Sequence, residues 1–127
     1  MGKLPKPTEA ELAILRVLWQ RGPSTVRQVQ QTLNEVKKTG YTTVLKQMQV
    51  MVEKGLLVRS ERYRSHVYEA RVPKEKTQQQ LTRNLLERAF DGSAKNLVLG
   101  ALSSQKVSAA ELQEIREMLD KFERKQR

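Results

Sequence analysis

The stretch Gly40–Gly55, GYTTVLKQMQVMVEKG, decides the fold. Apolar residues recur in it at i, i+4 and i+7, which predicts a helix with one buried stripe formed by Val44, Met48 and Met51. Gly55 is predicted to end this helix, because glycine commonly follows the last helical turn. The opposite side carries hydroxyl, amide and ammonium groups, which can hydrogen-bond or contact base edges in DNA. We therefore predict a recognition helix, with an ordinary solvated face as the alternative for this helix alone.

Four side chains on the polar side of this helix are the predicted base contacts. They are Thr42, Thr43, Lys46 and Gln47. Glutamine suits adenine, lysine suits guanine, and the threonine methyl group suits the methyl group of thymine.

Two helices are predicted before the recognition helix. A T-x-x-E capping box at Thr8 opens the first, over about residues 9–21. The second covers about residues 26–36, where apolar residues in a 3-4-3 spacing, Val36 included, predict one buried face. Trp19 continues the apolar stripe of the first helix and is predicted to lie in the core. A short turn joins the helix over about residues 26–36 to the recognition helix, which is polar on its outer side. Two helices in this arrangement form the helix-turn-helix pattern.

After Gly55 the periodicity of the sequence changes towards that of strands. Residues 56–62 and 66–72 predict a hairpin with residues 63–65 at its tip. A basic hairpin after a recognition helix is a wing, and basic side chains there are placed to hold DNA phosphates. The predicted phosphate contacts are Lys37, Lys38, Tyr41, Arg62 and Arg64. Packing on the preceding helix is an equal alternative for Tyr41, and His66 is either a further phosphate contact or simply exposed.

The second half of the chain predicts three more helices, over about residues 75–90, 93–102 and 108–122. Three helices in about fifty residues cannot bury this much apolar surface alone, so we expect a homodimer. The predicted interface residues are Leu81, Leu85, Leu97, Leu112, Ile115, Leu119 and Phe122. The alternative is that this segment folds back on the first half. The predicted fold is thus mainly α with a small β-hairpin, with a winged helix-turn-helix domain over residues 1–73 and a helical dimerisation domain over residues 74–127.

The charge of the chain favours a polyanionic partner. Its 127 residues hold 24 Lys and Arg against 14 Asp and Glu, a net charge of +10. Residues 1–73 hold thirteen of these bases against six acids (+7), whereas the remainder holds eleven against eight (+3). The first half is therefore the part expected to face double-stranded DNA. A non-specific architectural protein that coats DNA by charge is the rival interpretation.

Other classes of function lack the residues they need. The chain has no cysteine, which excludes disulfides and cysteine nucleophiles. Its single histidine, His66, has no partner at metal-ligand spacing, and no glycine-rich loop follows a strand. We therefore expect no enzymatic activity, no metal and no cofactor. No apolar run approaches the length of a membrane span, so we expect a cytoplasmic protein without a membrane partner.

Several motifs occur in one order along the chain. They are E-x-E-L-x-I-L-x-V-L-W at residues 9–19, GYTTV at 40–44, EKGL at 53–56, Tyr68, and FDGS at 90–93. In this arrangement the chain resembles the penicillinase repressor family of the BlaI/MecI/CopY type. The resemblance implies a dimeric transcriptional repressor that binds palindromic operators through an N-terminal winged helix. In many members a membrane-bound sensor peptidase triggers cleavage of the repressor, which weakens the dimer and frees the operator.

Three features depart from that family's pattern. The cysteine cluster of the copper-responsive branch is absent, which argues against copper sensing. The bond cut in the antibiotic-responsive repressors lies between Asn and Phe, whereas the matching pair in this sequence is Gly100–Ala101. Val50 occupies a position where the family often has a basic residue, which predicts a different operator preference.

Overall fold

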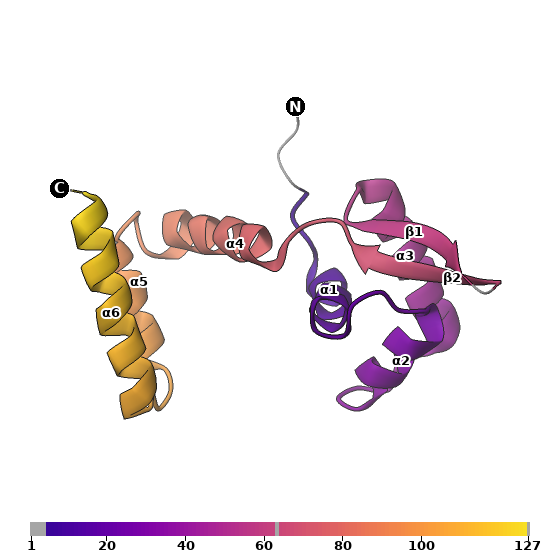
Figure 1. The fold of residues 1–127 in the computed structure, drawn as a ribbon, viewed down its shortest axis with the longest axis horizontal. Helices are drawn as coiled ribbons and strands as arrows, with labels where there is room; N and C mark the ends of the chain where they lie inside the picture. Colours follow the sequence, from indigo (N-terminus) through magenta and orange to yellow (C-terminus); the bar gives the residue numbers. More distant parts are fainter. Residues whose placement is uncertain (1–4, 63, 127) are drawn as a thin grey trace. The chain divides into compact units, whose positions relative to one another are not determined.

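The computed structural model describes residues 5–62 and 64–126 (Figure 1). By their contacts the residues form two compact units, one up to Arg83 and one from Asn84 onward. The predicted functional boundary after residue 73 stays a prediction.

The first unit contains three helices and a hairpin. These are α1 (Glu9–Arg21), α2 (Val26–Asn34), α3 (Tyr41–Lys54), β1 (Leu57–Arg62) and β2 (Ser65–Ala70), followed by the start of α4 (Lys74–Ala89) (Figure 1). The strands are antiparallel, with Leu57 opposite Ala70 and Arg62 opposite Ser65. This is the predicted winged helix-turn-helix, and the mainly α fold class is confirmed. The predicted hairpin tip includes residue 63, which lies outside the described residues.

Local sequence signals account for the ends of these helices. The Thr8 hydroxyl accepts from the Glu11 amide at 3.2 Å, and the Glu11 carboxylate accepts from the Thr8 amide at 2.9 Å, which confirms the capping box. Thr25 and Gln28 form the same reciprocal pair at the start of α2. Gly55 ends α3 with φ of +83°, a left-handed conformation that glycine adopts without steric cost.

The core of the first unit lies between its three helices and the hairpin. Its fully buried side chains include Ile14, Leu15, Val29, Val44, Met48, Met51 and Leu56. The hairpin joins this core through Tyr68, which is 1% exposed and whose backbone exchanges two hydrogen bonds with Ser24, at 2.8 and 2.9 Å. Trp19 packs against the core as predicted, and its indole Nε1 donates to the Val72 carbonyl at 3.0 Å. The wing is therefore anchored on the helices, as a lone hairpin would have to be.

One prediction about α2 is wrong. Val36 does not belong to a buried helix face: the helix ends at Asn34, and Val36 is 94% exposed. The side-chain oxygen of Asn34 accepts from the Thr39 amide at 2.6 Å, so it caps a turn instead of continuing the helix. Short polar side chains compete with helical hydrogen bonds in this way, and the apolar spacing past Asn34 is coincidental.

The second unit contains the end of α4, then α5 (Ala94–Ser103) and α6 (Ala109–Lys125), so the three predicted helices are present. Ser93 and Ser108 cap α5 and α6 by accepting from the amides of Asn96 and Glu111. None of the described residues of α5 or α6 is fully buried. The cluster of buried hydrophobic side chains among the described residues instead lies wholly in the first unit. Within residues 5–62 and 64–126, no helix has the length and apolar character needed to cross a bilayer.

Candidate nucleic-acid interface

The outer side of α3 is an exposed polar surface. Thr42, Lys46 and Gln49 lie on the side opposite the buried stripe of α3, because about 3.6 residues complete one turn. Thr43 is also exposed, at one edge of this surface, whereas Gln47 is half-buried where the surface meets the core. Three of the four predicted base contacts are thus exposed, and their contact with bases stays a prediction. Gln49 was missing from the predicted set, although its helical position groups it with Thr42 and Lys46.

The turn before α3 carries the first pair of predicted phosphate contacts. Lys37 and Lys38 are both exposed. The side-chain Nε2 of Gln30 donates to the Thr39 carbonyl at 3.2 Å, and the side-chain oxygen of Asn34 accepts from the Thr39 backbone amide, so two side chains of α2 hold the end of this turn. The turn therefore presents two cations at a defined place just before the recognition helix.

The wing carries further exposed basic side chains. Arg59, Arg62, Arg64 and His66 are all exposed, and Arg62 and Arg64 are the predicted phosphate contacts there. His66 Nε2 lies 3.8 Å from a carboxylate oxygen of Glu61, its partner across the hairpin. The hairpin thus offers arginine side chains to a polyanion, while a neighbouring acid offsets any positive charge on His66.

Tyr41, at the start of α3, contacts the preceding helix. The guanidinium carbon of Arg27, on α2, lies 5.1 Å from the centroid of the Tyr41 ring, a cation–π arrangement. Packing on the preceding helix, one of the two roles that the sequence left open, is therefore present for this ring. Arg27 itself was not predicted, since nothing in the local pattern links two residues so far apart in sequence.

A hollow of about 380 Å³ adjoins this pair, between α2, α3 and β2. Its lining residues are Thr25, Val26, Arg27, Tyr41, Leu45, Ser65, His66 and Tyr68. It brings Tyr41 and the wing residue His66 to one place, which the sequence did not predict.

The far end of α3 is tied to α1 by an ion pair. Lys54 Nζ lies 2.7 Å from Glu11 Oε2, and the Glu11 side chain is only 6% exposed. Burial raises the pKa of Glu11, but hydrogen bonds from Lys54 and from the Thr8 amide, with the attraction of the lysine charge, outweigh it and hold the pKa below its ordinary value of 4.5. Glu11 is therefore charged at neutral pH and fixes the last turn of α3.

The second unit exposes large apolar side chains. Its exposed members are Leu85, Val98, Leu99, Met118, Leu119 and Phe122, with Phe122 63% exposed. Among the predicted interface residues, Leu85, Leu119 and Phe122 are exposed, whereas Leu81, Leu97, Leu112 and Ile115 are half-buried.

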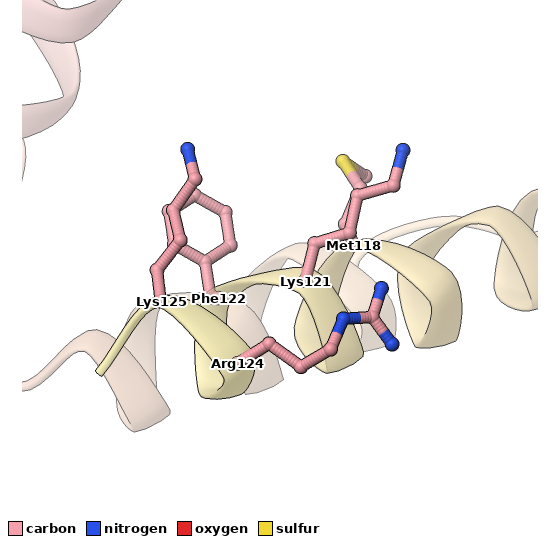
Figure 2. Close-up of a pocket in the computed structure, with 5 residues that line it drawn as sticks. All are labelled: Met118, Lys121, Phe122, Arg124 and Lys125. Atoms are coloured by element: carbon pink, nitrogen blue, oxygen red, sulfur yellow. The ribbon is translucent and has the colours of Figure 1, made fainter. Parts of the chain in front are cut away.

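On α6 a hollow of about 370 Å³ is lined by Met118, Lys121, Phe122, Arg124 and Lys125. Figure 2 shows Met118 and Phe122 projecting from the same side of the helix, with Lys121 and Lys125 beside them. An apolar surface with a cationic rim of this kind is typical of an interaction site.

The predicted cleavage position lies inside α5. Gly100 is half-buried, and a Cβ placed on it would lie 3.5 Å from the Phe90 ring, whereas Ala101 is exposed. Whether this bond is cut stays a prediction.

Across residues 5–62 and 64–126 there is no group of three or more His, Cys, Asp or Glu that could hold a metal ion.

The family model of the penicillinase repressor matches residues 7–121 of this chain. The chain belongs to the penicillinase repressor family. A penicillinase repressor of Bacillus licheniformis is 21% identical over 127 residues, which cover 100% of this chain and 99% of that protein. The transcriptional regulator BlaI of Mycobacterium tuberculosis is 36% identical over 69 residues, 54% of this chain and 50% of that protein. This penicillinase repressor homologue is thus a DNA-binding transcriptional repressor, and its relatives are repressors and not enzymes.

Solved structures show the same fold for the first unit. The DNA-binding domain of the repressor BlaI matches with a TM-score of 0.52 at 22% identity, over 60% of this chain and 93% of that one. Monomeric BlaI of Bacillus licheniformis in complex with the blaP half-operator matches with the same score, identity and coverage. The winged-helix fold of this penicillinase repressor homologue is therefore shared with BlaI.

Proposed function

We propose that this chain represses transcription as a homodimer that reads a palindromic operator with α3 in the major groove. The single observation that supports it best is the outer surface of α3, where Thr42, Lys46 and Gln49 are exposed side by side. A recognition helix needs such side chains, since they match the donors, acceptors and methyl groups of base edges. BlaI, which shares this fold, has been solved in complex with the blaP half-operator, and this supports operator DNA as the ligand of this chain.

Base reading and positioning fall to different groups in this proposal. Thr42, Thr43, Lys46 and Gln47 contact base edges, and the accessibility of Gln49 adds it to the set. Lys37, Lys38, Arg62 and Arg64 contact phosphates on either side of the helix. Phosphate contacts set the register and orientation of the protein on the duplex but carry no direct sequence information.

The homodimer forms through the second unit. Its α5 and α6 leave Val98, Leu99, Leu119 and Phe122 exposed, and such helices need a partner to exclude water from that surface. A second copy of the chain offers the same apolar residues, and two-fold symmetry is the commonest arrangement of homo-oligomers. A two-fold dimer carries two recognition helices, which matches an operator of two inverted half-sites.

Release from the operator by proteolysis is the least supported part of the proposal. A sensor-linked protease would cut within α5, at Gly100–Ala101, and weaken the dimer. A glycine inside a helix lowers local helix stability by up to about 1 kcal/mol, which favours the opening that a protease requires. Mass spectrometry of repressor recovered from induced cells tests this: fragments that end at Gly100 support it, and an intact chain on a free operator contradicts it.

The rival function is non-specific coating of DNA by charge, and one experiment separates the two. Duplexes bound by the full chain are selected from a random pool and sequenced. We expect enrichment of two inverted half-sites about one helical turn apart, centre to centre. A pool that stays random after several rounds, despite tight binding, would establish the architectural alternative instead.

A further inference from the structure

The hollow between α2, α3 and β2 borders the recognition surface. Tyr41 and Leu45 line it from α3, and each directly precedes, in sequence, a residue of the outer surface, Thr42 or Lys46. The remaining lining comes from the first turn of α2 and from the wing. The hollow therefore lies along the flank of α3, where the sugar-phosphate strand of a duplex runs when base edges face the helix.

The lining of this hollow suits an anion. It holds one permanent cation, Arg27, and the hydroxyls of Thr25, Ser65 and Tyr68, with no Asp or Glu among its lining residues. His66 adds no net attraction for an anion, because the carboxylate of Glu61 on the neighbouring strand lies 3.8 Å away and offsets any positive charge on the imidazole. Hydroxyl groups and the guanidinium group are among the side-chain groups that bind phosphate oxygens in DNA complexes.

Arg27 is held in a defined position. Arg27 is exposed, but its guanidinium group lies over the Tyr41 ring, 5.1 Å from the ring centroid. An exposed arginine ordinarily samples many rotamers, and ordering it on binding costs free energy. Stacking on an aromatic ring restricts the guanidinium group beforehand while its N–H donors remain available.

We propose that Arg27 binds a backbone phosphate of the DNA at this hollow, and that Tyr41 acts as a positioning residue through its ring. The proposal rests on the proposed function, since it assumes that α3 lies in the major groove. It assigns Tyr41 an indirect role: the ring orders Arg27, and the phenolic hydroxyl is dispensable. The phosphate contact is the same for every sequence, so it contributes to affinity and orientation and not to base preference.

The test uses the full chain, one duplex selected from a random pool, and one scrambled duplex of equal length. Arg27→Ala should weaken binding to both duplexes by about tenfold for each subunit of the dimer, the effect of one charge-assisted hydrogen bond. Because the dimer carries Arg27 twice, the steepness of the plot of log affinity against log salt should fall by about 1.8, which is about 0.9 for each neutralised phosphate. Arg16→Ala is the matched control, since Arg16 is an exposed arginine on α1 outside the hollow, and it should leave the slope unchanged.

Two variants of Tyr41 separate the ring from the hydroxyl. Tyr41→Phe should bind like the wild type, whereas Tyr41→Leu should weaken both duplexes several-fold. In the Arg27→Ala background Tyr41→Leu should have little further effect, because the ring then has no cation to position. Trp19 fluorescence establishes that each variant keeps its folded core.

Three outcomes would overturn the proposal. An unchanged salt slope for Arg27→Ala would exclude the phosphate contact. Equal losses of affinity in Tyr41→Phe and Tyr41→Leu would exclude a role for the ring. Fully additive losses of affinity in the double variant Arg27→Ala/Tyr41→Leu would exclude the coupling between the two residues. Failure of the proposed function is recognised separately. It appears as equal affinity of the wild type for both duplexes, a result that does not depend on Arg27.

Discussion

The ammonium group of Lys54 lies 2.7 Å from the carboxylate of Glu11 and joins the last turn of α3 to the first turn of α1. The same carboxylate completes the capping box with Thr8. One buried side chain thus stabilises the start of α1 and holds the end of the recognition helix, 43 residues further along the chain.

Removing Lys54 from this pair should lower stability more than removing the charge of Glu11. Lys54→Met leaves the buried carboxylate without its cation and should lower the free energy of unfolding by about 1.5–3 kcal/mol. Glu11→Gln leaves the half-exposed Lys54 in contact with water and should cost only about 0.5–1.5 kcal/mol. Urea unfolding followed by Trp19 fluorescence measures both, since Trp19 is the only tryptophan and packs on this core. A larger loss for Glu11→Gln than for Lys54→Met would contradict this account.

The ion pair should also make stability depend on acid pH. Because folding lowers the pKa of Glu11, its contribution is present above the ordinary value of 4.5 and is lost as the pH falls through the folded-state pKa. The difference in unfolding free energy between wild type and Glu11→Gln should therefore be largest at neutral pH and shrink below about pH 4.5. A constant difference across that range would exclude a lowered pKa.

Two lysines near the start of α3 should behave differently when they are replaced by alanine. Lys46→Ala should cost about 1–3 kcal/mol at one base position of each half-site and relax preference there. Lys37→Ala should weaken binding to all duplexes alike and reduce the steepness of the salt dependence by about one unit for each subunit of the dimer. Titration of matched and singly altered duplexes at several salt concentrations measures both. If the two variants were indistinguishable, Lys46 would be a phosphate contact as well.

The apolar surface of α6 should hold the dimer together. Leu119→Asp places a charge at a side chain that is 54% exposed in the single chain, and should dissociate the dimer. Gln113→Asp adds the same charge on the opposite side of the helix and should leave the dimer intact. Sedimentation at micromolar concentration distinguishes the two states. An unchanged mass for Leu119→Asp would move the interface elsewhere.

Gly100→Ala should stabilise α5. The new methyl group would lie 3.5 Å from the Phe90 ring, an ordinary contact, and alanine favours a helix interior over glycine by about 0.5–1 kcal/mol. Thermal melting followed by circular dichroism should show a higher midpoint, and limited proteolysis should slow at this segment. A lower midpoint would mean that Phe90 cannot accommodate the added carbon.

Most of the fold was predictable because its signals are local. The capping box at Thr8, the stripe from Val44 to Met51 and the glycine at residue 55 each specify a boundary or a face within a few residues. Val36 misled the prediction because an apolar spacing continued by chance past Asn34, whose side chain favours a turn. The outer surface of α3 followed from helical periodicity, although Gln49 was omitted from the predicted set and the half-burial of Gln47 was missed.

The contacts that refine the site are long-range and were not predictable. The Glu11–Lys54 pair and the stacking of Arg27 on Tyr41 depend on how α1, α2 and α3 pack against one another. A single sequence carries no periodic signal for such pairs. The interface residues of the second unit remain predictions, since the dimer proposed for them involves a second chain.

Base-analogue substitution tests most directly whether the outer surface of α3 reads base edges in the major groove. In a selected operator, each purine of a half-site is replaced in turn by its 7-deaza analogue, which removes the N7 acceptor from the major groove and leaves base pairing intact. The affinity of the full chain should fall by about 1–3 kcal/mol at one or more positions in each half-site. Unchanged affinity at every position would contradict the account, because α3 would then not bind through those edges.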